Sequence, residues 1–467
     1  MVRRSPTLLL LLALPGSARA AAYYYPDSGT RCIARACAII ASVDDLSALY
    51  HNPAALVRLR EPQVFASLTG VEQYVEFDRA DEPDESLAFD PVYNDAPWMA
   101  IPALGASATF GLPRTTFAAG LVTPQAPDYS YPQDGPQRYI LVDALIWQFG
   151  VVASAAHRVT DWLSVGAGVG WWVARVEQEL AASSGLEGMD PTEDPAMDLD
   201  IVLRSWDWFT PSANAGALVE PLPWLAVGLS VQPPIHFEAA GSLETDFTGH
   251  AWSGVLLEGE TFTDPDVTLL LTVPLVLRGG VQVRPTERLD LEFATVFEDW
   301  SVLDVVTVTD MDLVIETDPD FFDEDAVVTN DVELKAGYQD AWSFRLGGAY
   351  RLSDRFTTRL GALYETSGVP LRTQGVGLVD GNKWGLGTGG TVRLGRLDVD
   401  LAVAQQLVAN RRIEDSLLQQ LTLVVDPEAP EDSEVGYGKY VGNGHYTSRL
   451  TYVSTALTWH FGPAAAP

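Results

Sequence analysis

The chain has 467 residues and a formal net charge of −34, because 63 acidic residues stand against 29 basic ones. This imbalance argues against nucleic acid or an acidic surface as the partner, since both require basic patches. After the first 20 residues, no stretch of the sequence approaches the apolar length of about 18 residues that a membrane helix needs.

The first element in chain order is a secretory signal peptide at residues 1–20. Arg3-Arg4 form its positive region, an apolar run follows over 8–14, and Ala18 to Ala20 match the A-x-A cleavage pattern. We expect the mature chain to begin at Ala21, as that of an exported protein.

The next informative segment holds an aspartate pair and an Asn-Pro corner. Asp44 and Asp45 can cap or occupy the first turn of a short helix. Asn52 precedes Pro53, which disfavours continued helix and starts a turn. The sequence therefore predicts a short helical segment that ends at this corner.

From residue 63 to residue 461, short and long connections alternate. The short connections, rich in turn residues, lie at 111–116, 159–162, 221–224, 285–288, 352–355 and 394–397. The long polar segments lie near 76–98, 124–138, 176–200, 241–265, 302–331, 367–384 and 411–443. Thirteen connections separate fourteen strands, and their strict alternation is typical of an outer-membrane barrel with short periplasmic turns and long external loops.

The strands alternate with a period of two. Over 356–364, Phe356, Leu360 and Tyr364 share one face, and Arg359 lies on the other. Periodicity does not say which face is outside; the export signal, the loop alternation and the size favour lipid there. Aromatic residues near strand ends are typical of interfacial girdles, although core filling would give the same pattern.

The order of these features resembles the FadL family, outer-membrane transporters of long-chain fatty acids and other hydrophobic compounds. The N-terminal likeness is carried by Ser28-Gly29-Thr30-Arg31, Asp44-Asp45, Ser47-Ala48 and Asn52-Pro53-Ala54. Later matches are Pro274, Glu298 to Ser301, Asp340 to Trp342, Gly347 to Tyr350, Arg359 to Tyr364, Ser367 to Pro370 and Asp380 to Asn382. Together they cover nearly the whole mature chain.

This resemblance implies an all-β fold, a single 14-stranded antiparallel transmembrane β-barrel with an N-terminal hatch inside its lumen. We place the hatch at residues 21–62, the barrel at 63–461 and a short tail at 462–467. The hatch motif consists of Asp44, Asp45, Ser47, Ala48, Asn52, Pro53 and Ala54. A closed barrel has no free sheet edge, so we expect a monomer.

Cys32 and Cys37 lie five residues apart and do not belong to the family pattern. In an oxidising compartment they form a disulfide that stiffens the hatch, or remain buried thiols. A metal site or a redox function has less support, because no histidine or second cysteine pair lies nearby to complete a zinc site.

Two kinds of side chain are candidates for the ligand pocket. The family resemblance implies that the aromatic start of the mature chain, with Tyr23, Tyr24 and Tyr25, borders the pocket; a disordered end is the alternative. Arg345 and Arg359 face the lumen and could hold a carboxylate, or pair with Asp290, Glu292, Asp398 or Asp400.

The acidic segment 302–331 could bind calcium, but its spacing fits no EF-hand loop. We interpret it as a solvated loop and predict no metal site.

The sequence thus predicts a passive outer-membrane channel that takes up hydrophobic compounds, long-chain fatty acids first, when its hatch rearranges. Its partners would be that hydrophobic solute, outer-membrane lipid and lipopolysaccharide, with no cofactor. The alternatives are an uptake channel for aromatic hydrocarbons, an aqueous porin, and a structural or adhesive barrel that transports nothing. An enzyme has the least support, because no G-x-S-x-G motif occurs and the six histidines are scattered.

Overall fold

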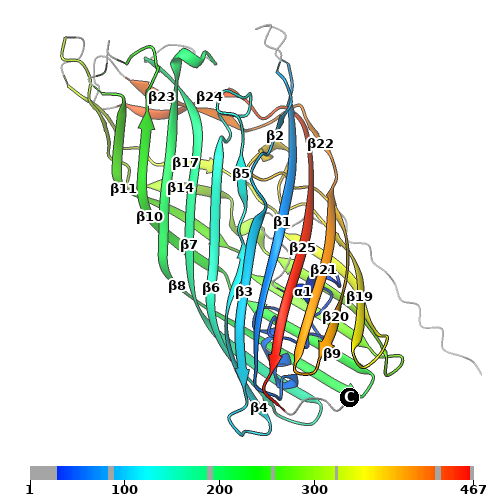
Figure 1. Ribbon diagram of the computed structural model, residues 1–467. Helices are drawn as coiled ribbons and strands as arrows, with labels where there is room; N and C mark the ends of the chain where they lie inside the picture. The colour runs from blue at the N-terminus through cyan, green and yellow to red at the C-terminus, as the bar shows by residue number, and fades with distance from the viewer. Residues whose placement is uncertain are drawn as a thin grey trace, which may run out of the picture.

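The computed structural model describes residues 29–81, 89–186, 193–253, 257, 259–320, 324–425 and 433–462. Its main sheet closes on itself, because β1 (Gln63–Arg79) pairs antiparallel with β25 (Gly444–His460) from Gln63↔His460 to Arg79↔Gly444. The predicted fourteen-stranded antiparallel barrel is confirmed (Figure 1). No helix among the described residues is long and apolar enough to cross a membrane.

Between β1 and β25 the wall contains twelve further strands, two of which are interrupted. In chain order they are β3 (Met99–Ala108), β4 (Thr115–Gln125), β6 (Asp143–Arg158), β7 (Leu163–Leu186), β8 (Asp198–Leu222), β9 continued by β10 (Leu225–Gln232 and Ile235–Asp246), β11 continued by β12 (Thr261–Val273 and Val276–Val283), β13 (Leu289–Glu298), β18 (Ala341–Arg351), β19 (Phe356–Glu365), β20 (Lys383–Leu394) and β21 (Leu397–Val408).

Shorter elements extend the wall at the end that carries the long connections. They are β2 (Val92–Tyr93), β5 (Asp128–Ser130), β14 (Val305–Thr309), β15 (Leu313–Ile315), β16 (Ala326–Val328), β17 (Val332–Lys335), β22 (Arg411–Ile413), β23 (Gln419–Val425) and β24 (Glu434–Tyr440), with the 3-10 turns η2 (Pro195–Met197), η3 (Trp300–Val302) and η4 (Leu371–Thr373). Figure 1 shows β23 and β24 crossing above the tall strands at this end.

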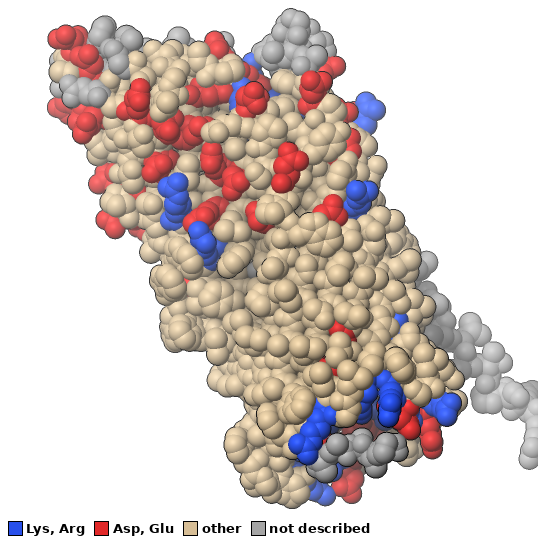
Figure 2. Space-filling model, viewed as in Figure 1, with Lys and Arg blue, Asp and Glu red and all other residues tan. Residues whose placement is uncertain are grey.

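The outward face of the wall is apolar and the inward face is polar. In β21, Leu401 and Val403 are 60% and 51% exposed, whereas Asp398 and Asp400 are buried. This is the reverse of a water-soluble protein, and it is the arrangement that a lipid-facing barrel requires. Figure 2 shows the consequence, a belt almost free of charged side chains between two charged ends.

One predicted loop is wrong over much of its length. The polar segment 176–200 was expected to be a loop, but β7 runs to Leu186 and β8 begins at Asp198. The two strands stay paired as far as Ser183↔Asp198. Polar residues there indicate a wall that continues beyond the apolar belt, not an irregular connection.

The wall has interruptions at prolines. Among the described residues, β3 pairs with β4 only over Leu104–Ala108, and β4 shifts its register against β6 next to Pro124. Pro233-Pro234 separates β9 from β10, and Pro274 separates β11 from β12. Proline cannot donate to a ladder, so the sheet bends or opens at these levels.

Candidate functional site: the hatch and its seat

The described part of the hatch, residues 29–62, lies inside the barrel. It contains α1 (Thr30–Ile33), α2 (Ala48–His51) and the 3-10 helix η1 (Pro53–Arg58), all short. Nearly all its side chains from 29 to 57 are buried, which such short helices achieve only inside a larger body. Figure 1 shows this segment in dark blue within the lower half of the wall.

The Asn-Pro corner ties the hatch to itself and to the wall. The Asn52 side-chain oxygen accepts from the Ala54 N–H at 3.1 Å, capping η1, which starts at Pro53. Its Nδ2 donates to Ile40 O at 3.0 Å and to Ala217 O of β8 at 3.2 Å. One fully buried amide therefore satisfies three backbone groups, which explains why the corner needs asparagine.

Arg31 is the electrostatic centre of the hatch. Its guanidinium contacts Asp44 of the hatch at 3.0 Å, and Asp398 and Asp400 of β21 at 3.2 and 3.1 Å. Asp45 lies 3.8 Å away. The arginine is buried, so it bonds hatch to wall through charge-assisted contacts shielded from water.

The two motif aspartates have different surroundings. The Asp44 side chain is 61% exposed, and the guanidiniums of Arg31 and Arg359 lower its pKa to about 2. Burial raises the pKa of Asp45, despite the attraction of Arg31, and the charge of Asp44 adds to this effect. Asp45 accepts from the N–H of Ser47 at 3.0 Å and from its hydroxyl, so it fixes the turn that leads into α2.

The wall carries glycines where the hatch backbone comes close. A Cβ on Gly361 of β19 would lie 2.1 Å from the carbonyl of Arg35, and one on Gly387 of β20 would lie 2.1 Å from Ile33 O. A Cβ on Gly166 would lie 2.4 Å from Pro53 C, and one on Gly228 would lie 2.5 Å from Ile40 O. Glycine inside a strand often marks such a close backbone approach. These glycines were therefore a signal for hatch contacts that were not predicted from the sequence.

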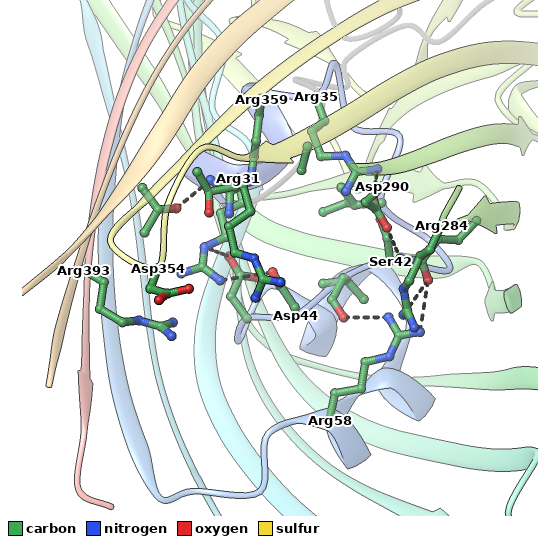
Figure 3. A pocket seen from close by; sticks show the side chains of 18 of the residues that line it. Arg31, Arg35, Ser42, Asp44, Arg58, Arg284, Asp290, Asp354, Arg359 and Arg393 are labelled. Atoms are coloured by element: carbon green, nitrogen blue, oxygen red, sulfur yellow. Dashed lines mark hydrogen bonds and ion pairs between the residues drawn. The ribbon is translucent and has the colours of Figure 1, made fainter. Parts of the chain in front are cut away.

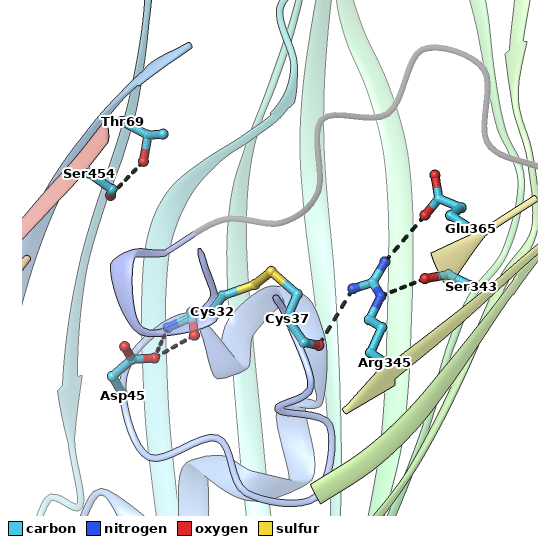
Figure 4. Close-up of a disulfide and its surroundings, with 9 residues drawn as sticks. Cys32, Cys37, Asp45, Thr69, Ser343, Arg345, Glu365 and Ser454 are labelled. Carbon is cyan, nitrogen blue, oxygen red and sulfur yellow. Dashed lines mark hydrogen bonds and ion pairs between the residues drawn. A yellow bond between two sulfur atoms is a disulfide. The ribbon is translucent and has the colours of Figure 1, made fainter. Parts of the chain in front are cut away.

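Cys32 and Cys37 form a disulfide in this structure, beside the end of α1 (Figure 4). Arg345 of β18 lies next to it: Nε donates to Ser343 Oγ at 2.8 Å, and Nη1 points at Cys37 O at 3.5 Å. Glu365 is 3.8 Å from the same guanidinium. Arg345 therefore contacts the hatch loop and a carboxylate of the wall.

Arg359 of β19 has other partners. It donates to Thr391 Oγ1 at 2.5 Å, and Asp400 is 3.6 Å away. The structure thus does not bring Arg345 and Arg359 together, and both are paired with protein groups. Tyr23, Tyr24 and Tyr25 lie outside the described residues, as does the signal peptide 1–20.

A cavity of about 500 Å³ separates the hatch from the wall at the end that carries the short turns. Arg31, Arg58, Arg284 and Arg393 approach it from different sides (Figure 3). Within the described part of the chain, no group of three or more His, Cys, Asp or Glu side chains is arranged to hold a metal ion. The acidic segment 302–331 contributes β14, β15 and β16 instead of forming one irregular loop.

A closed barrel with an apolar belt and a folded segment filling its lumen defines an outer-membrane channel protein. Residues 11–431 match the family of outer membrane transport proteins described as OMPP1/FadL/TodX. The chain therefore belongs to this family, whose members are transport proteins and not enzymes.

Solved structures share the fold. A FadL homologue from Pseudomonas aeruginosa superposes with a TM-score of 0.74 at 18% identity, covering 95% of this chain and all of its own. The toluene transporter TbuX from Ralstonia pickettii gives 0.62 at 15% identity, over 93% of this chain and 99% of its own. TodX from Pseudomonas putida gives 0.62 at 14%, with the same coverage. Among curated protein sequences, none matches this chain.

Proposed function

We propose that this protein takes up hydrophobic compounds passively, long-chain fatty acids first, when the hatch shifts in the barrel. The observation that carries the proposal is an apolar cluster between hatch and wall. Ile33 and Ala34 of the hatch pack with inward-facing side chains of β1, β3, β21 and β25; these are Val71, Met99, Ile101, Ala402, Val408, Leu450 and Tyr452. A lumen that needed only water-soluble cargo would have polar groups there.

The same cluster contains Ala126, which follows the end of β4 and lies two residues after Pro124, where β4 shifts its register against β6. An apolar path therefore runs from the hatch to a place where the ladder between β3 and β4 is incomplete. We propose that solute leaves sideways here, into the membrane. Such a route lets a hydrophobic molecule avoid the charged cavity below the hatch. Entry into that cavity would displace water from arginine and aspartate side chains, which costs free energy.

Aromatic hydrocarbons are the second candidate substrate class. Two of the similar structures are toluene transporters, and their likeness to this chain is nearly as extensive as that of the FadL homologue. An apolar cluster of mixed aliphatic and aromatic side chains suits either class, because burial of apolar surface is non-directional. Competition between the two classes is therefore the informative measurement.

Ile101→Ala, which shortens an inward side chain of the cluster, is expected to weaken binding of radiolabelled oleate to the detergent-purified protein. Losing apolar contact of about 1–2 kcal/mol corresponds to roughly 5–30-fold in Kd. Leu104→Ala, on the outward face of the same strand, is the matched control and should bind like the parent. Equilibrium dialysis gives both values, and displacement of oleate by toluene measures the second substrate class.

Saturable binding of neither oleate nor toluene would contradict the proposal and favour a structural or adhesive barrel. Binding that falls equally in both variants would place the ligand outside the cluster.

A further inference from the structure

Basic side chains are concentrated in the cavity between the hatch and the short turns, which we call the arginine vestibule. Eight arginines and four aspartates line it, with no lysine. The whole chain has only 29 basic residues against 63 acidic ones. A local excess of positive charge in a strongly acidic protein marks a place built for anions. Figure 2 shows basic side chains gathered at this lower end and acidic ones at the other.

Three of these arginines have no carboxylate within 4 Å among the residues that the structure describes: Arg284, Arg351 and Arg355. Arg284 donates to Gln282 Oε1 at 3.0 Å and weakly to Pro223 O, and Arg351 donates to Glu287 O at 3.0 Å. Both acceptors are neutral; Arg351 and Arg355 are exposed and Arg284 is half-buried, so water is what an anion would displace from these guanidiniums. Arg284 and Arg351 therefore keep both charge and spare N–H donors for a further ligand.

Arg35 differs from these three arginines, because it is buried and paired. Arg35 is 4% exposed and binds Asp290 through Nη2 at 2.6 Å. Its Nε has no hydrogen-bond partner in the described part of the chain, but this atom is buried and does not reach the surface of the cavity. Arg35 therefore adds positive charge beside the vestibule without offering a donor to an anion in it.

We propose that the arginine vestibule is an anion-binding site at the periplasmic mouth of the barrel, taking a small molecule that carries a carboxylate or phosphate. The planar guanidinium fork matches both groups, and lysine would not replace it. A cavity of about 500 Å³ admits a head group or a small anion and is too small for a folded protein. The short turns that rim it face the periplasm in barrels of this kind.

The anion has two sources, a free phosphate in the periplasm or the carboxylate of an amphiphile. The anion site does not depend on the proposed uptake function. None of the residues that line the vestibule belongs to the apolar cluster, and an anion can enter the vestibule without movement of the hatch. The two sources differ in what accompanies the charge, so inorganic phosphate, octanoate and uncharged octanol distinguish them.

The test is protection of arginines from phenylglyoxal in the full-length, detergent-purified protein, mapped by peptide mass spectrometry. Inorganic phosphate at about ten times its Kd is expected to slow modification of Arg284, Arg351 and Arg355 by about tenfold, because only about a tenth of the sites is then empty. Arg114 and Arg288 lie on the same rim outside the vestibule and should react as before. Protection by octanoate as well supports a carboxylate ligand, and protection by phosphate alone supports a free inorganic anion.

Equilibrium dialysis of radiolabelled phosphate gives the second readout. The triple variant R284Q/R351Q/R355Q should lose binding, whereas R114Q/R288Q/R412Q, with the same change in charge, should keep it. Equal reactivity of all five arginines with and without anions would overturn the proposal. So would phosphate binding that survives the first triple variant, or protection by octanol equal to that by octanoate.

Discussion

Arg31→Ala is expected to loosen the hatch more than any other single substitution in it. The change leaves Asp44, Asp398 and Asp400 without the guanidinium that contacts all three. Asp398 keeps Arg393 at 2.7 Å and Asp400 keeps Arg359 at 3.6 Å. The cost therefore falls below the value of about 3–5 kcal/mol for a buried charge that loses its partner. We expect a lower melting temperature of the purified protein and faster cleavage of the hatch by added protease.

Arg114→Ala is the control for this prediction. Its pair with Asp161 has the same charges and a 3.0 Å contact, but both side chains are exposed. Exposed pairs contribute about 0–1 kcal/mol, so the melting temperature should hardly change. Arg31→Lys, which keeps the charge and loses the fork, should fall between the two. Identical melting and protease resistance of the Arg31→Ala variant and the parent would show that Arg31 does not hold the hatch.

Gly361→Ala is expected to disturb the seat of the hatch from the side of the wall. The added Cβ would lie 2.1 Å from Arg35 C and O, and these are backbone atoms that cannot rotate away. Overpacking of a close contact typically costs about 1–3 kcal/mol, and we expect the upper end of that range here. Thermal unfolding and proteolysis of the hatch measure the effect.

Gly279→Ala provides the comparison on a neighbouring part of the barrel. Gly279 also sits inside a wall strand, but a Cβ there meets only Leu229 and Thr295 side chains at 3.6 Å or more. Both substitutions replace a glycine inside a strand by alanine, so the two variants differ mainly in what the new Cβ contacts. Equal stability of Gly361→Ala and Gly279→Ala would mean that the hatch backbone does not contact β19 at Gly361.

Much of the fold could be predicted from the sequence because it depends on local chemistry. Turn residues mark the short connections, and the period of two fixes which side chains share a face. The prediction for 176–200 was wrong because polarity was taken as a sign of a loop. Above the apolar belt the outward face of a wall strand meets water, so Glu177 and Glu179 of β7 alternate with the buried Val176 and Leu180 in a regular strand.

The site was harder to predict because its partners are far apart in the chain. The motif pointed to Asp44 and Asp45, but their common partner Arg31 also binds Asp398 and Asp400, more than 360 residues away. No local sequence pattern indicates a contact between residues so far apart in the chain. The seat glycines could have been found from their positions inside strands, although only the structure shows which of them face the hatch.

We propose that solute passes only when the hatch moves, and a disulfide between hatch and wall tests this most directly. Thr30 Oγ1 of the hatch lies 2.8 Å from Ser454 Oγ of β25, so Thr30→Cys with Ser454→Cys places two sulfur atoms within bonding reach. Mass spectrometry would verify the new bond beside Cys32–Cys37.

The measurement is uptake of radiolabelled oleate by cells that lack another transporter of this kind and express the double-cysteine protein. We predict background uptake when the bond is formed and recovery of the parental rate after reduction, with the parent insensitive to the same reductant. Uptake at the parental rate by the fully cross-linked protein would contradict the account, because solute would then pass a hatch that cannot move.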